Sequence, residues 1–217
     1  MLQAIVFDFD GTILETEGPD YQSWQEIFDA HGSELTLDVW IQCVGGAPAG
    51  FDPFAILERQ TGVVLDRPST NQNRRKRVLD LIEQQPPMPG VLATIAAAEE
   101  AGIALAVASS SPSVWVEGNL NRLGLRHHFQ AVRTADDVER VKPDPTLYRL
   151  AAAALGSLPQ RTLAIEDSRT GMLAAKGAGL HCVVVPNSVT QFSDFSQADL
   201  RLTSLADLTP AELFARF

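Results

Sequence analysis

The chain has 217 residues, of which 45% are hydrophobic and 20% are charged, and its formal net charge is −10 at pH 7. This apolar content supports a packed core, either in one large domain or in a core domain with a smaller insertion, and it argues against a disordered chain. The acidic balance argues against nucleic acid or an anionic membrane as a partner, because both attract basic surfaces.

The first predicted element is a strand over residues 4–7, which runs directly into Asp8, Asp10 and Gly11 in the segment DFDGT. Its consecutive apolar residues, β-branched and aromatic side chains among them, indicate a strand that is buried on both faces. Because side chains two apart in an extended chain lean the same way, Asp8 and Asp10 can converge beyond the end of this strand. Such a pair implies a protonated carboxyl or a cation between the two, whereas an ordinary Asp-Gly turn is the alternative.

The next part of the chain, residues 14–86, has helical periodicity and no strand pattern. Trp24, Phe28 and Phe54 recur at helical spacing, which favours a helical core over substrate contacts. The glycine-rich segment Gly45–Gly50 predicts a flexible loop. Helices are expected over residues 21–31, 35–44, 51–57 and 69–84.

After the break at Pro86–Gly90, strands alternate with helices, which predicts a parallel sheet covered on both faces. The strand over residues 4–7 must join this sheet. The fold class is therefore α/β, a doubly wound, Rossmann-like parallel sheet core with an inserted all-α cap domain. The core comprises residues 1–14 and 87–217, and the cap comprises residues 15–86. Helices are expected over residues 91–101, 112–123, 145–155 and 168–178, and strands over 103–108, 129–132, 162–165, 181–185 and 199–202.

Polar residues follow several of these strands, where doubly wound sheets bind their ligands. Ser109–Ser111 follow one strand, Glu166 and Asp167 follow another, and Lys142 lies between them in the loop VKPDP. Taken singly, these would be a turn serine, a surface lysine and a helix N-cap. Together with Asp8 and Asp10 they supply a carboxylate nucleophile, an acid and base, cation ligands and donors for phosphoryl oxygens, as phosphoryl transfer requires.

Four segments in this order, DFDGT, AVASS, VKPDP and AIEDS, resemble the motifs of the haloacid dehalogenase superfamily. The helical insertion and the wording VKPDP and EDSxxG resemble its β-phosphoglucomutase-like phosphatase branch. The resemblance covers essentially the whole chain. It implies a Mg²⁺-dependent phosphatase that hydrolyses small, sugar phosphate-like monoesters through an aspartyl-phosphate intermediate.

The resemblance also implies a role for each motif residue. Asp8 would be the nucleophile, Asp10 the acid and base, and Lys142 a partner of both Asp8 and the phosphate. Magnesium suits the hard oxygen ligands on offer. The substrate-binding residues would be Thr12, Ser109, Ser110 and Lys142, and the metal would be held by Asp8, the Asp10 backbone carbonyl and Asp167, with Glu166 helping directly or through water.

Departures from the branch bear on the activity. The mutase handles its sugar phosphate with a cap histidine and a cap arginine, whereas this chain has Asp20 after Glu17-Gly18-Pro19 and no arginine in Gly45–Gly50. These departures argue against mutase activity. A hexose-phosphate mutase and a noncatalytic phosphometabolite-binding protein are the alternatives to the phosphatase. The basic run Arg74–Arg77 is either a solvated helix face or a set of substrate-binding cations.

The cysteines and the N-terminal segment indicate the compartment. Cys43 and Cys182 form no CxxC motif, and we interpret both as reduced core residues. The first residues predict a strand instead of a signal peptide, and no apolar run approaches the roughly 18 residues of a membrane span. We expect a cytoplasmic monomer that acts on a small phosphorylated metabolite.

Overall fold

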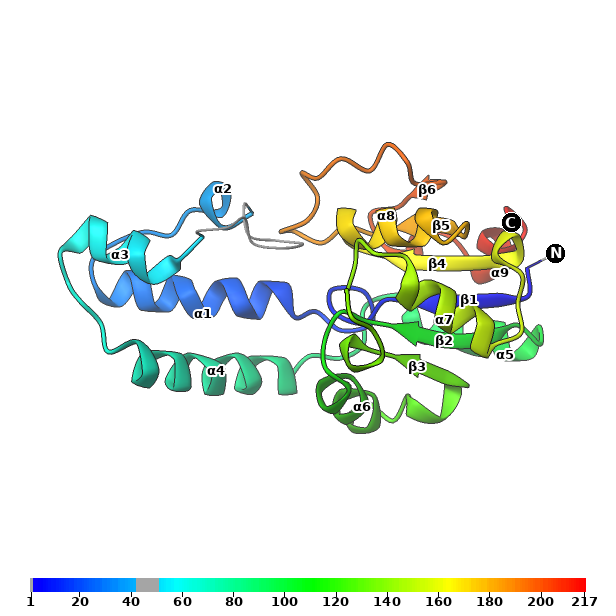
Figure 1. Ribbon diagram of the computed structural model, residues 1–217, viewed down its shortest axis with the longest axis horizontal. Coiled ribbons are helices and arrows are strands. Elements are labelled where there is room, and N and C mark those ends of the chain that lie inside the picture. Colours follow the sequence, from blue (N-terminus) through cyan, green and yellow to red (C-terminus); the bar gives the residue numbers. More distant parts are fainter. Residues whose placement is uncertain (1, 42–50) are drawn as a thin grey trace. The chain divides into compact units, whose positions relative to one another are not determined.

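The computed structural model describes residues 2–41 and 51–217, and the predicted Gly45–Gly50 loop and Cys43 lie outside this part of the chain. The chain divides into two compact units. The first, Met1–Leu14 with Pro86–Phe217, is called the sheet unit below, and the second, Glu15–Gln85, is called the helical unit. Figure 1 shows the elements of both along the chain.

The sheet unit is built on a parallel sheet whose six described strands lie in the order β3-β2-β1-β4-β5-β6 (Figure 1). The first strand is central and fully buried, as its apolar composition predicts. Phe7 is in register with Val107 of β2 and with Ile165 of β4, so the residues after these positions emerge at one edge. The strands are β1 (Ala4–Phe7), β2 (Ala104–Ala108), β3 (Ala131–Arg133), β4 (Thr162–Glu166), β5 (His181–Val184) and β6 (Leu200–Arg201).

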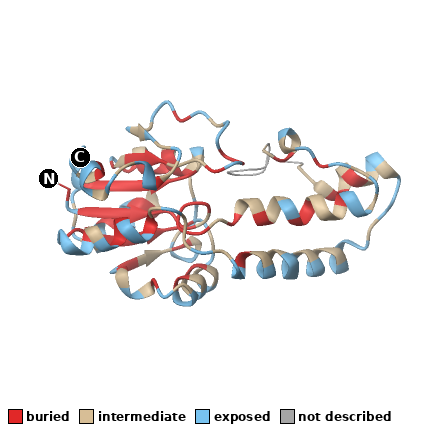
Figure 2. Cartoon of the chain, turned by 180° about the vertical axis from the view of Figure 1, so that it is seen from behind, coloured by how far each residue is buried: buried red, intermediate tan, exposed pale blue. Residues whose placement is uncertain are grey.

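Helices connect the strands and cover the sheet. Val6, Ala106 and Ala164 pack with α7 and α8 into one buried cluster. Because strand side chains alternate, Phe7 and its counterparts in β2 and β4 face the other way, where the Phe7 ring meets Phe129 edge-on. Figure 2 shows the strands as the most continuous buried part of this unit. Its helices are α5 (Val91–Glu100), α6 (Ser113–Arg122), α7 (Thr146–Ala154), α8 (Arg169–Gly177) and α9 (Pro210–Phe214), with short 3₁₀ helices at Arg126–His128, Ala135–Asp137, Pro159–Arg161 and Leu205–Asp207.

The predicted fold class, a parallel α/β sheet with an all-helical insertion, is confirmed. Most of the predicted elements differ from the observed ones by one to four residues at their ends. Helix α9 was not predicted, although Thr209 caps it in a reciprocal box with Glu212, a pattern that the sequence carries. The helix expected over 35–44 is the short α2, Leu37–Trp40, within the described residues.

The helical unit contains α1 (Glu17–Ala30), α2, α3 (Pro53–Thr61) and α4 (Arg67–Glu83). Its core includes the buried Trp24, Phe28 and Phe54, as predicted, and the Trp24 and Phe54 rings meet edge-on at 4.9 Å.

The basic run on α4 divides into two pairs. Arg74 forms an ion pair with Asp20 of α1, and Arg77 forms one with Glu26 of α1. These two arginines therefore join α4 to α1, while Arg75 and Lys76 are exposed.

Two further observations concern Cys182 and the length and apolar character of the helices. Cys182 is a free, fully buried thiol, and burial raises its pKa above the ordinary value, which makes it unreactive. Within residues 2–41 and 51–217, no helix combines the length and the apolar character needed to cross a membrane.

Candidate active site

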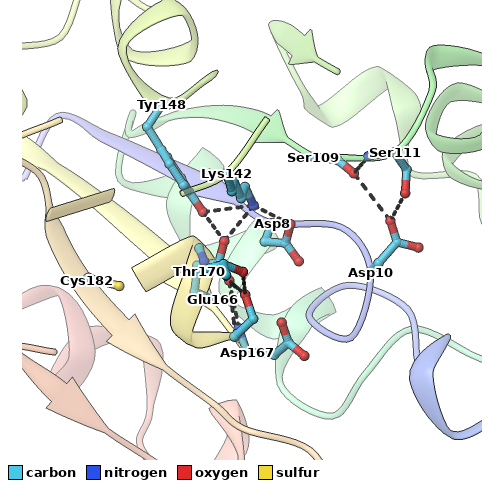
Figure 3. A network of polar contacts seen from close by, with 12 residues as sticks. Asp8, Asp10, Ser109, Ser111, Lys142, Tyr148, Glu166, Asp167, Thr170 and Cys182 are labelled. Carbon is cyan, nitrogen blue, oxygen red and sulfur yellow. Dashed lines mark hydrogen bonds and ion pairs between the residues drawn. The ribbon is translucent and has the colours of Figure 1, made fainter. Parts of the chain in front are cut away.

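Acidic side chains and one lysine meet beyond the carboxyl ends of β1 and β4. Lys142 Nζ lies 2.5 Å from Asp8 Oδ1 and 2.6 Å from Glu166 Oε1, as Figure 3 shows. Asp8, Glu166 and Asp167 each offer a carboxylate oxygen, and these oxygens lie within 4.8 Å of one another. All four side chains are buried. The register of the parallel strands thus brings together residues that are far apart in the sequence.

This cluster has an excess of negative charge. Three carboxylates lie in the cluster with one ammonium group, which forms ion pairs with Asp8 and Glu166. Burial raises the pKa of Asp8 to about 8, with Glu166 and Asp10 acting in the same direction and Lys142 opposing them. Burial alone would lower the pKa of Lys142, but the Asp8 and Glu166 carboxylates raise it above its ordinary value. The lysine is therefore a permanent cation, and the cluster is suited to bind another one.

Glu166 is engaged on both of its oxygens. Oε1 accepts from Lys142 and, at 2.6 Å, from the hydroxyl of Tyr148. Oε2 accepts from the backbone N–H of Asp167 and from the hydroxyl of Ser168. Burial and the neighbouring Glu166 carboxylate raise the pKa of Tyr148 well above its ordinary value, so its hydroxyl remains a donor. Both oxygens of Glu166 are therefore engaged, and Oε1 is the one that pairs with Lys142.

Gly171 in α8 makes room for the Glu166 carboxylate. A Cβ built on Gly171 would lie 1.8 Å from Glu166 Oε1. Alanine stabilises a helix by about 1 kcal/mol relative to glycine, but this overlap must displace Glu166, and disrupting a buried ion pair costs about 3–5 kcal/mol. We therefore expect Gly171→Ala to lower the free energy of unfolding by roughly 2–4 kcal/mol in urea denaturation.

The matched control for this substitution is Gly118→Ala in α6. A Cβ there meets nothing within 4 Å, so helix propensity decides and the variant should gain up to about 1 kcal/mol. Equal free energies of unfolding for Gly171→Ala and Gly118→Ala would contradict the claim that Gly171 makes room for Glu166.

Asp167 is held by Asn187 and lies close to the backbone at Gly11. Asn187 Nδ2 donates to Asp167 Oδ2 at 2.8 Å, while its own Oδ1 accepts from the backbone N–H groups of Val189 and Thr190. Gly11 has φ +80°, and a Cβ on it would lie 2.3 Å from Asp167 Oδ2. Gly11 thus lets the chain turn and lets its backbone approach the carboxylate closely.

The remaining predicted residues lie beside this cluster or away from it. Asp10 Oδ2 accepts from the hydroxyls of Ser111 at 2.6 Å and Ser109 at 3.3 Å, and Figure 3 shows the three together. Thr12 is buried, and its hydroxyl has no hydrogen-bond partner within the described residues. Ser110 is exposed. Asp10 is not in the carboxylate group formed by Asp8, Glu166 and Asp167.

Several residues of the site escaped the sequence analysis. Tyr148 has the helical spacing of a core residue, and Asn187 follows β5 in a segment with no recognised motif. The expectation that polar residues after the strands of the sheet belong to the site applies to Asn187 as well, because it follows β5. Ser111 follows a predicted strand, but the sequence did not indicate its hydrogen bond to Asp10. Trp115, which donates to Asp10 from α6, belongs to no motif that would indicate this contact.

A doubly wound sheet whose strand ends gather paired carboxylates and a buried lysine carries the groups that phosphoryl-transfer enzymes use, at the edge where such sheets bind ligands. The model of the haloacid dehalogenase-like hydrolase family matches residues 5–185, and the chain belongs to this family.

Relatives agree with this assignment. Bacillus subtilis has a relative named "Putative phosphatase YhcW", which is 48% identical over 213 residues, covering 98% of this chain and 96% of the relative. Fructose-1-phosphate phosphatase YqaB of Escherichia coli is 31% identical over 195 residues, covering 84% of this chain and 95% of the relative. The crystal structure of CbbY from Rhodobacter sphaeroides in complex with phosphate is 34% identical with a TM-score of 0.74, covering 96% of each chain. The chain is therefore a phosphatase.

Proposed function

We propose that this phosphatase is Mg²⁺-dependent and hydrolyses small sugar phosphates through an aspartyl-phosphate on Asp8. The main support is the 2.5 Å ion pair between Lys142 and Asp8 within a buried acidic cluster. A relative named for fructose 1-phosphate and another crystallised with phosphate support the substrate class.

The residues fit a two-step displacement at phosphorus. An oxygen of Asp8 attacks phosphorus, the bond from phosphorus to the sugar oxygen breaks, and Asp10 gives that oxygen a proton. A water molecule then attacks the phosphorus of the aspartyl-phosphate while Asp10 takes its proton, which releases phosphate and restores Asp8. Lys142 favours the ionised form of Asp8, against the effect of burial, and pairs with the phosphoryl oxygens. Ser109 and the unpartnered hydroxyl of Thr12 donate to the same oxygens.

The acidic cluster fits a divalent cation, because three buried carboxylates converge beside a single lysine and their oxygens are hard ligands. Since Glu166 is occupied by Lys142 and Tyr148, Asp8, Asp167 and the backbone carbonyl of Asp10 would hold the ion. When bound, Mg²⁺ neutralises negative charge at the carboxylates and the phosphoryl oxygens.

The raised pKa of Asp8, about 8, predicts a pH dependence for Mg²⁺ binding. Below this value the carboxyl of the metal-free protein carries a proton that the ion must displace, so affinity falls as pH falls, at most about tenfold per pH unit. Above pH 8 the dependence should level off. Isothermal titration with Mg²⁺ at pH 6, 7, 8 and 9 in two buffers of different ionisation enthalpy measures both affinity and proton release. A constant affinity from pH 6 to 8 would contradict this expectation.

Two features favour hydrolysis over the alternatives. Asp20, which replaces the mutase histidine, is committed to the ion pair with Arg74. The pairing of Asp8 with Lys142 supplies a nucleophile that a noncatalytic binding protein would not need. We infer that the helical unit, Glu15–Gln85, is the cap that the sequence predicts over residues 15–86. Monomeric state and cytoplasmic location remain predictions.

The test is phosphate release from a panel of sugar phosphates, nucleotides and an aryl phosphate, with Mg²⁺ and with EDTA. We expect Mg²⁺-dependent release that is fastest with a sugar phosphate. Interconversion of sugar phosphates without release would identify a mutase, and binding without either reaction would identify a noncatalytic protein.

A further inference from the structure

Asp10 is held by donors from the segment that begins α6. Trp115 Nε1 donates to Asp10 Oδ1 at 2.8 Å, and Ser111 Oγ donates to Oδ2 at 2.6 Å. Ser109 Oγ adds a longer contact to Oδ2 at 3.3 Å. Both oxygens of the carboxylate are therefore fixed, so its orientation is set by these side chains as well as by its own backbone.

These donors are themselves well anchored. The backbone N–H of Ser111 donates to Ser109 Oγ at 3.0 Å, which fixes the turn after β2. At the start of α6, the N–H of Ser113 donates to Asp136 at 2.9 Å. Trp115 lies in the first turns of this helix, so its indole is presented from a rigid element. Such second contacts are what hold a functional group within a narrow range of orientations.

We propose that Trp115, together with Ser111, is a positioning residue that keeps Asp10 beside Ser109 for proton transfer to the leaving oxygen. This inference rests on the proposed role of Asp10. Trp115 acts through Asp10, so its loss should matter most for substrates whose leaving oxygen needs a proton. Alkyl phosphates need that proton, whereas an aryl phosphate such as p-nitrophenyl phosphate has a stable leaving anion and needs it little.

The experiment compares kcat/KM of Trp115→Phe with the wild type for fructose 1-phosphate and for p-nitrophenyl phosphate. Hydrogen bonds to charged groups contribute about 1.5–3 kcal/mol, so we expect a loss of about tenfold or more with fructose 1-phosphate and less than about twofold with p-nitrophenyl phosphate. Ser111→Ala should show the same selective loss. Ser111→Thr keeps the hydroxyl, so its kcat/KM with fructose 1-phosphate should stay near that of the wild type. Val114→Ala, a neighbour in α6 that is 83% exposed, is the control and should change neither value.

A double-mutant cycle tests whether the effect passes through Asp10. In an Asp10→Asn background, Trp115→Phe should cause no further loss with either substrate. Equal losses with both substrates, a gain with fructose 1-phosphate, or no change at all would overturn the positioning role. If Trp115→Phe does not fold, as judged by its melting temperature, the serine variants decide the question. A wild type that is inactive on both substrates would overturn the proposed function and this inference with it.

Discussion

Asp8→Asn is expected to abolish phosphate release, lowering kcat by at least about 10⁴-fold, the scale of effect seen when a nucleophile is removed. The carboxamide has nearly the same shape, but its oxygen is a poor nucleophile. The variant should nevertheless fold well. It removes one carboxylate from a buried cluster of three in which Lys142 already pairs with Glu166 as well, so the metal-free protein should unfold at the same temperature as the wild type or at a higher one.

The two readouts are measured together, as steady-state phosphate release and as melting temperature in EDTA. Asp29→Asn, which neutralises an exposed carboxylate in the helical unit, is the charge control and should alter neither. Activity that persists in Asp8→Asn would contradict the assignment of the nucleophile. Loss of activity together with a large fall in melting temperature would mean that the residue is structural.

Lys142→Met should have the opposite effect on stability. The substitution keeps a long apolar side chain but leaves Asp8 and Glu166 without their shared cation, and breaking a buried ion pair in this way costs about 3–5 kcal/mol. Activity should also fall, by roughly 10²-fold or more, because the phosphoryl charge loses a fixed partner. Urea denaturation in EDTA gives the free energy of unfolding, and saturating Mg²⁺ should recover part of the loss.

The control is Lys176→Met, which breaks the half-exposed ion pair between Lys176 and Asp199 and should cost no more than about 1 kcal/mol. In the double variant Asp8→Asn with Lys142→Met, part of the lost stability should return, because one of the unpaired carboxylates is gone. Equal stability losses for Lys142→Met and Lys176→Met would show that the buried cluster does not depend on its lysine.

The strands and the catalytic candidates could be predicted because both correspond to short patterns in the sequence. A run of apolar residues marks a buried strand, and a parallel sheet places the residues after such strands at one edge. The sequence alone therefore predicts that four residues meet at this edge, and the structure shows them within one buried cluster: Asp8, Lys142, Glu166 and Asp167.

The supporting residues could not be predicted in this way, since their roles depend on packing between elements. Tyr148 has the spacing of a core residue on α7, and the position of its hydroxyl beside Glu166 follows from the way α7 lies on the sheet. Trp115 likewise reaches Asp10 only because of how α6 leaves the turn after β2. The basic run Arg74–Arg77 could be read either as a solvated face or as a ligand site, and the partners of Arg74 and Arg77 became known only from the packing of α4 on α1.

The central claim is that phosphate passes through a covalent intermediate on Asp8. The most direct measurement is the intact mass of Asp10→Asn, quenched in acid shortly after mixing with Mg²⁺ and p-nitrophenyl phosphate. The leaving anion of this substrate needs little help from an acid, so the intermediate should still form, whereas loss of the base should slow its hydrolysis. We expect a protein heavier by one phosphoryl group, with the modification on the peptide that contains Asp8 and removable by hydroxylamine. An unmodified protein in Asp10→Asn, together with a wild type that releases phosphate at the usual rate, would contradict the covalent mechanism.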